Sequence, residues 1–172
     1  MKVYIASALE NAAEVARLRD ILAFAGHVVT YDWTIHGSVQ SEGAERIAEV
    51  AAAEMAGVID ADVLVALLPG GRGTHTEIGI ALGSGVPVIL RGAEHYAREC
   101  AFYRAPGVID RVPAWCSLEG IVAALTVWDA RSSRGAAAQV FGPEWGEQKP
   151  APAAYLPVPP CFFVDPCTEA TP

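Results

Sequence analysis

The sequence predicts a three-layer α/β sandwich of the flavodoxin-like or Rossmann-like kind, with a parallel sheet of about five strands. Three observations predict this fold. Strand-like and helix-like segments alternate over the first 130 residues. The connections between these segments are short, as in βαβ units. The segment 62–69 (DVLVALLP) is apolar almost throughout, which is typical of a parallel strand buried on both faces.

The first half of the chain supplies two strand–helix pairs. Residues 2–9 (KVYIASAL) form a short β-rich segment. Residues 11–26 place apolar side chains at helical spacing and end in a glycine that favours a helix stop. Residues 27–33 (HVVTYDW) predict the second strand. Residues 41–61 predict the second helix, with Ser41 as a suitable cap.

The pattern continues after the buried strand. Residues 74–85 (THTEIGIALGSG) predict a third helix that ends in glycine, and 86–92 (VPVILRG) predict a fourth strand. Residues 108–115 contain a short fifth strand. Residues 117–132 predict a final helix, with Ser117 as its cap.

Composition limits the class of protein. The chain has 172 residues, of which 52% are hydrophobic and 19% charged, so it can bury a real core. No apolar run reaches the roughly 20 residues that a transmembrane helix needs. Glu10, Glu14 and Arg17 follow the short apolar start at once, which disfavours a signal peptide. We therefore expect a cytoplasmic protein with no membrane contact.

Charge and cysteine content exclude further classes. The net charge of −8 argues against non-specific binding of nucleic acid, which needs a Lys/Arg surface. The four cysteines, Cys100, Cys116, Cys161 and Cys167, form no CxxC pair, and no His lies at zinc-like spacing. We expect free thiols, with a Cys161–Cys167 bridge as the alternative. We expect neither a metal nor a cofactor.

The composition changes near residue 135. Residues 1–134 are predicted to form the catalytic domain, and 135–172 a Pro-rich C-terminal tail that is extended or wraps a neighbouring subunit. The stretch CFFVDPC inside this tail is apolar. Docking of that stretch onto the body or onto a partner is left open.

Candidate binding residues follow the predicted strands. In an open parallel sheet, ligands bind beyond the carboxyl ends of the strands, near the point where the strand order reverses. The polar residues and glycines expected there are Ser7, Asn11, Asp32, Trp33, Gly71, Gly73 and Thr74. Trp33 suits either a stacking surface for a nucleobase or a place in the core.

The Gly-rich loop of residues 69–74 (PGGRGT) differs from the known phosphate loops. A Walker loop needs Gly-Lys-Ser/Thr, which is absent, and a dinucleotide GxGxxG would follow the first strand instead of the third. The loop could still offer backbone N–H groups to an anion at the start of a helix. Taken alone, the glycines do not identify a nucleotide site.

Two glutamates near this loop indicate a different function for the site. Glu77 is expected about one turn into the third helix, where it could simply favour the helix dipole. Glu54 is expected near the end of the second helix, facing the same cleft. In such a pair one carboxylate can act as a nucleophile while the other handles a proton. This arrangement can cleave a glycosidic bond through a covalent sugar intermediate.

The motifs KVYIASAL, HVVTYDW and AAAEMAGVIDADVLVALLPGGRGTHTEIGIALGSGVPVIL together resemble the nucleoside 2-deoxyribosyltransferase superfamily. That group includes 2′-deoxynucleoside 5′-monophosphate N-glycosidases and CMP hydrolases. The resemblance covers residues 2–91. It implies a flavodoxin-like fold, a nucleoside or nucleotide substrate, and a homo-oligomer whose sites lie near subunit contacts.

The resemblance also implies roles for individual residues. The Gly-x-x-x-Glu-x-Gly element of the family matches Gly73 to Gly79, which makes Glu77 the nucleophile that attacks C1′. Tyr4 matches the tyrosine that positions this glutamate. Glu54 matches an acid/base carboxylate that is usually an aspartate in the family. Asp62 matches a recurrent aspartate, and a role as a cap or turn residue is the alternative.

The choice of substrate stays open at this point. The monophosphate hydrolases have a Gly-Ser-x-Arg-Gly-Gly-type loop after the first strand, whereas this chain has ASALENA, which favours a nucleoside. Arg72 or Arg91 could replace the missing arginine. His36 and His75 are expected to be polar loop residues instead of catalysts. A non-catalytic nucleotide-binding module is the second hypothesis; a hydride-transfer or flavin protein has no support in the loops.

Overall fold

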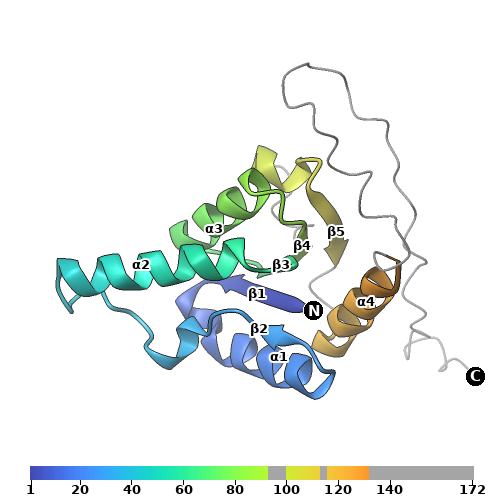
Figure 1. Cartoon of the computed structure of the whole chain (residues 1–172), viewed down its shortest axis with the longest axis horizontal. Coiled ribbons are helices and arrows are strands. Elements are labelled where there is room, and N and C mark those ends of the chain that lie inside the picture. Colours follow the sequence, from blue (N-terminus) through green and yellow to red (C-terminus); the bar gives the residue numbers. More distant parts are fainter. Residues whose placement is uncertain (93–99, 113–115, 132–172) are drawn as a thin grey trace, which may run out of the picture.

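A computed structural model describes residues 1–92, 100–112 and 116–131, which form a five-stranded parallel sheet flanked by helices (Figure 1). The strands are β1 (Lys2–Ser7), β2 (Val28–Val29), β3 (Val63–Leu67), β4 (Val88–Arg91) and β5 (Val108–Val112). The helices are α1 (Ala12–Phe24), α2 (Ala44–Ile59), α3 (Arg72–Gly83) and α4 (Leu118–Arg131). Three short 3₁₀ turns are η1 (Leu9–Asn11), η2 (Trp33–Ile35) and η3 (Ala101–Arg104). The predicted α/β class is confirmed.

The sheet is doubly wound. Its strand order is β2-β1-β3-β4-β5, so the order reverses between β1 and β3. Helices α2 and α3 cover one face, and α1 and α4 cover the other (Figure 1). The central strand β3 is buried along its whole length, as its apolar sequence requires. The crevice of this fold is therefore expected at the carboxyl ends of β1 and β3.

The second strand is much shorter than the predicted range 27–33. Its ladder ends at Val29, and the chain then turns into η2. The turn forms because Asp32 accepts a hydrogen bond from the backbone N–H of Thr34, while the indole Nε1 of Trp33 donates to the Ile5 carbonyl at 2.9 Å. Side-chain contacts with the rest of the fold thus override the local strand pattern.

The helix starts also differ in detail. The N-cap of α2 is Gly43, with φ of 93°, and not Ser41. Helix α3 begins two residues before the predicted Thr74, because the Thr74 hydroxyl accepts a hydrogen bond from the Gly71 N–H. Ser117 is confirmed as a cap of α4, since its Oγ accepts from the Gly120 N–H at 3.2 Å.

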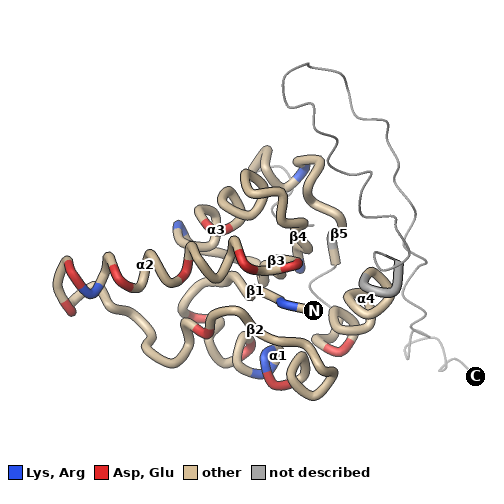
Figure 2. The backbone as a smooth tube through the Cα atoms, viewed as in Figure 1, with Lys and Arg blue, Asp and Glu red and all other residues tan. Residues whose placement is uncertain are grey.

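Several sequence-based expectations concern parts of the chain that the structure does not describe. The Pro-rich tail at 135–172, with Cys161 and Cys167, lies outside the described residues, as do residues 113–115 of the predicted fifth strand. In the described part, no helix is both long and apolar enough to cross a membrane. Figure 2 shows the basic residues of this part scattered over several elements, with acidic residues on α1 and α2.

Gly57 determines how closely α2 approaches the sheet. A Cβ at this position would lie 2.7 Å from Tyr31 Cβ and 3.2 Å from a ring carbon of Tyr4. Gly79, in α3, is also helical, but a Cβ there would meet nothing within 4 Å. The two glycines therefore offer a matched pair of Gly→Ala substitutions, one at a crowded position and one at an open position.

We expect Gly57→Ala to lower the melting temperature, because the methyl group would push α2 away from β1. Gly79→Ala should instead stabilise the protein by roughly 0.5–1 kcal/mol through higher helix propensity. Thermal unfolding followed by circular dichroism measures both. Equal effects of the two substitutions would contradict the close packing at Gly57.

Candidate active site

A hydrogen bond between Tyr4 and Glu77 lies at the centre of the candidate site. The Tyr4 hydroxyl donates to Glu77 Oε1 at 2.5 Å. Tyr4 is in the middle of β1 with no exposed surface, and Glu77 is in α3 with only 8% of its surface exposed. The bond joins a strand and a helix that are 73 residues apart in sequence. The predicted pairing of this tyrosine with this glutamate is thus present in the fold.

Burial strongly changes the acidity of Glu77. Removal from water raises the pKa of its carboxyl group, the Tyr4 hydrogen bond lowers it, and the charge of Glu54 raises it, with a net value of about 7. The same burial, together with the neighbouring carboxylate, raises the pKa of the Tyr4 phenol. Tyr4 therefore stays a hydrogen-bond donor while Glu77 changes its charge near neutral pH.

Glu54 is the second carboxylate of the site. It lies in α2, which packs against α3, and its side chain is half-buried. Burial raises the pKa of Glu54, and the nearby imidazole of His36 opposes this shift. Two helices on one face of the sheet thus bring Glu54 and Glu77 within electrostatic range of each other, as the sequence predicted.

The loop between β3 and α3 is held in place by two side chains, one at the end of β1 and one in the turn that follows. Ser7 Oγ donates to the Leu67 carbonyl at 2.7 Å, and Asn11 Nδ2 donates to Ser7 Oγ at 2.9 Å and to the Pro69 carbonyl at 3.1 Å. Ser7 and Asn11 are therefore found at the carboxyl end of β1, as expected. Their polar groups hold the loop in place, which is a supporting role.

The glycines of this loop differ in what surrounds them. A Cβ at Gly70 would lie 2.5 Å from Thr74 Cγ2, so this glycine is required by close packing. A Cβ at Gly71 or Gly73 would meet nothing within 4 Å. Gly73 precedes Glu77 by four residues in the same helix, so both lie on one helix face. The space beside Gly73 is thus open, one turn before the buried carboxylate.

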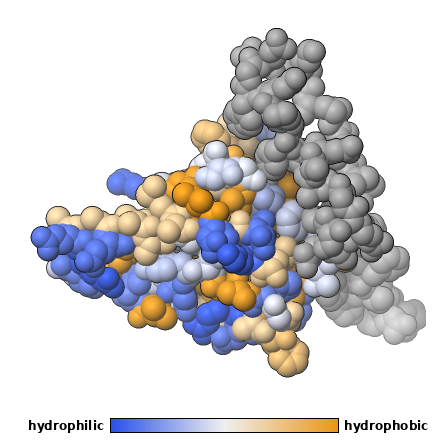
Figure 3. Space-filling model, in the orientation of Figure 1, coloured by the Kyte–Doolittle hydropathy of each residue, from blue (hydrophilic) through white to orange (hydrophobic). Residues whose placement is uncertain are grey.

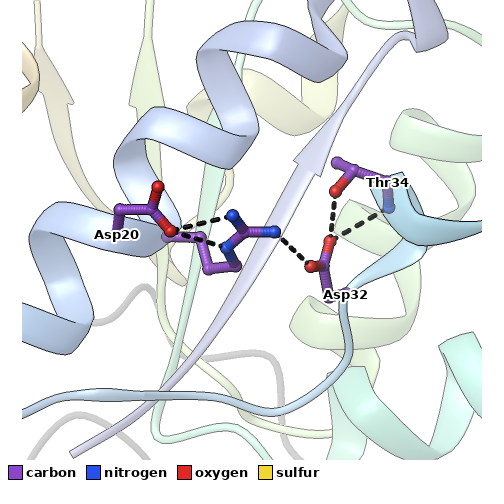
Figure 4. A network of polar contacts seen from close by, with 4 residues as sticks. Asp20, Asp32 and Thr34 are labelled. Carbon is purple, nitrogen blue, oxygen red and sulfur yellow. Dashed lines mark hydrogen bonds and ion pairs between the residues drawn. The ribbon is translucent and has the colours of Figure 1, made fainter.

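Asp32 is fully engaged by protein groups (Figure 4). Its Oδ2 accepts from Arg19 Nη1 at 2.6 Å, and its Oδ1 accepts from the N–H and the hydroxyl of Thr34 at 3.0 and 2.5 Å. Burial raises its pKa, but the bonds from Thr34 and Arg19 outweigh burial and lower the pKa overall. Arg19 also pairs with Asp20. Asp32 therefore anchors the turn after β2 to α1, and direct substrate binding loses support.

Two further candidates, Asp62 and Trp33, have contacts that suit a structural role. Asp62 lies at the amino end of β3, opposite the carboxyl edge, and accepts the backbone N–H of Lys2 at 2.6 Å. This bond supports the alternative, structural role of Asp62, in which it helps to align β1 with β3, over substrate binding. Trp33 is 5% exposed and belongs to the core, so the second of the two roles considered for it has support.

The two arginines considered for phosphate binding are not equivalent. Arg91 Nη1 pairs with Glu14 Oε1 at 2.9 Å, and its Nε donates to the Cys116 carbonyl at 3.0 Å. Arg91 thus joins β4 to α1. Arg72 is exposed at the first position of α3, and its guanidinium forms no ion pair within the described residues. Arg72 is the arginine of the two that could meet an anion at the Gly-rich loop.

The structure adds residues that the sequence pattern did not single out. Tyr31 contacts α2 at Gly57, and its hydroxyl lies 2.9 Å from His36 Nε2. On the other side of α3, the buried Tyr103 hydroxyl lies 2.7 Å from His75 Nε2. Both His residues were expected in loops; His36 follows η2, but His75 lies inside α3, and nothing in the sequence predicted their tyrosine partners. In the described segments, no group of three His, Cys, Asp or Glu could hold a metal.

Known proteins match both the sequence and the fold. Residues 3–100 match the family model described as nucleoside 2-deoxyribosyltransferase. The structure is similar to that of the Clostridium botulinum CMP N-glycosidase BcmB, with 18% sequence identity and a TM-score of 0.51. This match covers 74% of the present chain and 99% of BcmB, and at this identity it supports the shared fold alone. A search of curated proteins found no match.

The raised pKa of Glu77 predicts an unusual pH dependence of stability. Between its usual pKa of 4.5 and about 7, the folded protein holds a proton that the unfolded chain has lost. The free energy of unfolding therefore falls as pH rises through this range. Glu77→Gln removes the titration. Between pH 5 and pH 8, its free energy of unfolding should therefore rise by roughly 3 kcal/mol relative to that of the wild type.

Urea unfolding at a series of pH values measures this difference. Glu45→Gln, at an exposed position of α2, is the matched control and should follow the wild type. Parallel pH profiles for wild type and Glu77→Gln would show that the folded protein does not hold this proton.

Proposed function

We propose that this chain, which belongs to the nucleoside 2-deoxyribosyltransferase family, cleaves the N-glycosidic bond of (2′-deoxy)nucleosides and can pass the sugar to a second base. One observation supports this most: a buried carboxylate, Glu77, accepts a hydrogen bond from Tyr4 beside a second carboxylate, Glu54. A purely structural buried carboxylate would more often be paired with a cation. Here the neighbours are a phenol and another acid.

In the first step, Glu77 is the nucleophile. Tyr4 holds its Oε1, which leaves Oε2 to form a bond with C1′ of the sugar. The bond between C1′ and the base nitrogen breaks, and its electron pair leaves with the base. The negative charge of Glu77 also stabilises the positive charge that develops on the sugar in the transition state.

Glu54 is the proposed proton donor and acceptor. Its raised pKa favours the protonated form that can give a proton to the departing base. In the second step, a base or a water molecule attacks C1′ and loses a proton to the Glu54 carboxylate, and the bond to Glu77 breaks. Exclusion of water from the site favours transfer over hydrolysis.

Two alternatives remain as proposals. A nucleoside 5′-monophosphate N-glycosidase is the first, since BcmB is a CMP N-glycosidase and Arg72 could meet a phosphate. The engagement of Arg91 by Glu14 favours a nucleoside instead. A non-catalytic nucleotide-binding module is the second alternative, and it would bind without releasing a base.

Other features of the chain also stay predictions. These are a homo-oligomer, a cytoplasmic location and a catalytic domain at 1–134. The exposed side chains of Met55 and Ile59 on α2 offer apolar surface for a second copy.

The reaction can be tested with a panel of nucleosides and 5′-monophosphates, with and without a free acceptor base, analysed by chromatography. We expect base release from nucleosides, and a new nucleoside when an acceptor is present. Glu77→Gln should reduce base release by about a thousandfold or more, because the amide is a poor nucleophile. Its circular dichroism spectrum should match the wild type. Full activity in this variant would exclude the proposed mechanism.

The pH profile of kcat/KM tests the role of Tyr4. Only ionised Glu77 can attack, so its ionisation should produce a rise in kcat/KM at about pH 7, and loss of the Glu54 proton should limit this rise on the alkaline side. Tyr4→Phe removes the hydrogen bond that lowers the pKa of Glu77, and the rise should move to higher pH by roughly one unit. An unshifted profile in Tyr4→Phe would mean that the phenol does not control this carboxylate.

A further inference from the structure

Tyr31 borders the carboxylate pair, although it belongs to neither α2 nor α3. Its Cβ and the ring of Tyr4 lie against the same position of α2, Gly57. Glu54 precedes Gly57 by three residues and therefore lies on the same helix face. Burial, and after it the charge of Glu54, raises the pKa of the Tyr31 phenol. The phenol is thus part of the surroundings of Glu54.

His36 determines which way the hydroxyl proton of Tyr31 points. His36 Nδ1 lies 2.9 Å from the carbonyl oxygen of Gly37. A carbonyl oxygen can only accept, so Nδ1 has the hydrogen. In the neutral imidazole Nε2 is then an acceptor, and the Tyr31 hydroxyl, 2.9 Å away, donates to it. The single hydroxyl hydrogen of Tyr31 is therefore used by His36.

The Tyr31 phenol, whose neighbour Glu54 is the proposed proton donor to the base, therefore meets a ligand as a hydrogen-bond acceptor, through the lone pairs of its oxygen. Arg46, whose charge reaches Tyr31, pairs with Glu42 and Glu49 at the hydrophilic outer end of α2 (Figure 3).

We propose that the Tyr31–His36 pair makes the site prefer a nucleobase with an exocyclic amino group, such as cytosine or adenine, over its oxo counterpart, uracil or hypoxanthine. An amino group offers N–H donors to the Tyr31 oxygen, whereas a carbonyl oxygen there would face lone pairs. The inference rests on the proposed function and names the substrate class of that same site. A mismatch at one neutral hydrogen bond corresponds to roughly tenfold in rate.

Two substrate pairs test the preference: deoxycytidine against deoxyuridine, and deoxyadenosine against deoxyinosine. The members of each pair share a sugar and a ring framework and differ in the amino or oxo group. At pH 8 we expect kcat/KM for the amino member to exceed that of the oxo member by about tenfold or more. Equal values, or a preference for the oxo member, would overturn the inference.

Substitution of the pair separates its role from general damage. His36→Phe frees the Tyr31 hydroxyl to donate, so the amino-to-oxo ratio should fall to about one or reverse. Tyr31→Phe removes the oxygen and should also bring the ratio to about one. Tyr103→Phe is the matched control, because it removes a phenol that pairs with a different histidine, His75, and should leave the ratio unchanged. An unchanged ratio in Tyr31→Phe would overturn the inference even if His36→Phe fails to fold.

A binding measurement keeps this inference distinct from the proposed function. Calorimetry with Glu77→Gln compares deoxycytidine with deoxyuridine in the absence of turnover, and we expect tighter binding of deoxycytidine. Release of bases by the wild type without any amino preference would contradict the inference alone. Absence of base release from every nucleoside would contradict the proposed function, and the inference with it.

Discussion

The hydrogen bond between Tyr4 and Glu77 is the constraint on which the site depends. It requires a phenol in the middle of β1 and a carboxylate one and a half turns into α3. The absence of a side chain at Gly57 lets α2 pack closely against the same tyrosine. A carboxylate placed there by the fold loses contact with water, and its pKa rises to about 7. The fold thus accepts a destabilising group at the position of the proposed nucleophile.

The rest of the carboxyl edge supports this arrangement. Ser7 and Asn11 hold the loop that leads into α3, and the Thr74 hydroxyl caps that helix. Arg19 and Asp32 fix the turn after β2, from which Tyr31 and His36 reach toward Glu54. Most polar side chains at this edge bind other protein groups, so few are left for a ligand. Among them, Tyr31 has its hydroxyl hydrogen engaged by His36 and can only accept, which is the basis of the proposed preference for amino bases.

Local patterns predicted the order of strands and helices and singled out Glu54 and Glu77, whereas Tyr4 was assigned through the family resemblance; the structure brings these three side chains together. Local patterns were insufficient wherever a contact between distant segments decides the outcome. The second strand stops early because Trp33 bonds to β1 and Asp32 to α1. Tyr31 and His36 are only five residues apart, but their contact depends on the η2 turn, which these long-range bonds fix, so the pair could not be predicted from local pattern. Asp62 was expected at the start of the third strand, but its bond to the Lys2 backbone became evident only in the structure.

The central claim, that Glu77 forms a covalent bond with the sugar, can be tested directly by mass spectrometry. A 2′-fluorinated deoxynucleoside destabilises the positively charged transition state and allows a slow intermediate to accumulate. We expect the intact protein to gain the mass of the fluorinated sugar, peptide mapping to find this mass on Glu77, and Glu77→Gln to gain nothing. Base release without any adduct, or an adduct on another residue, would show that Glu77 is not the nucleophile.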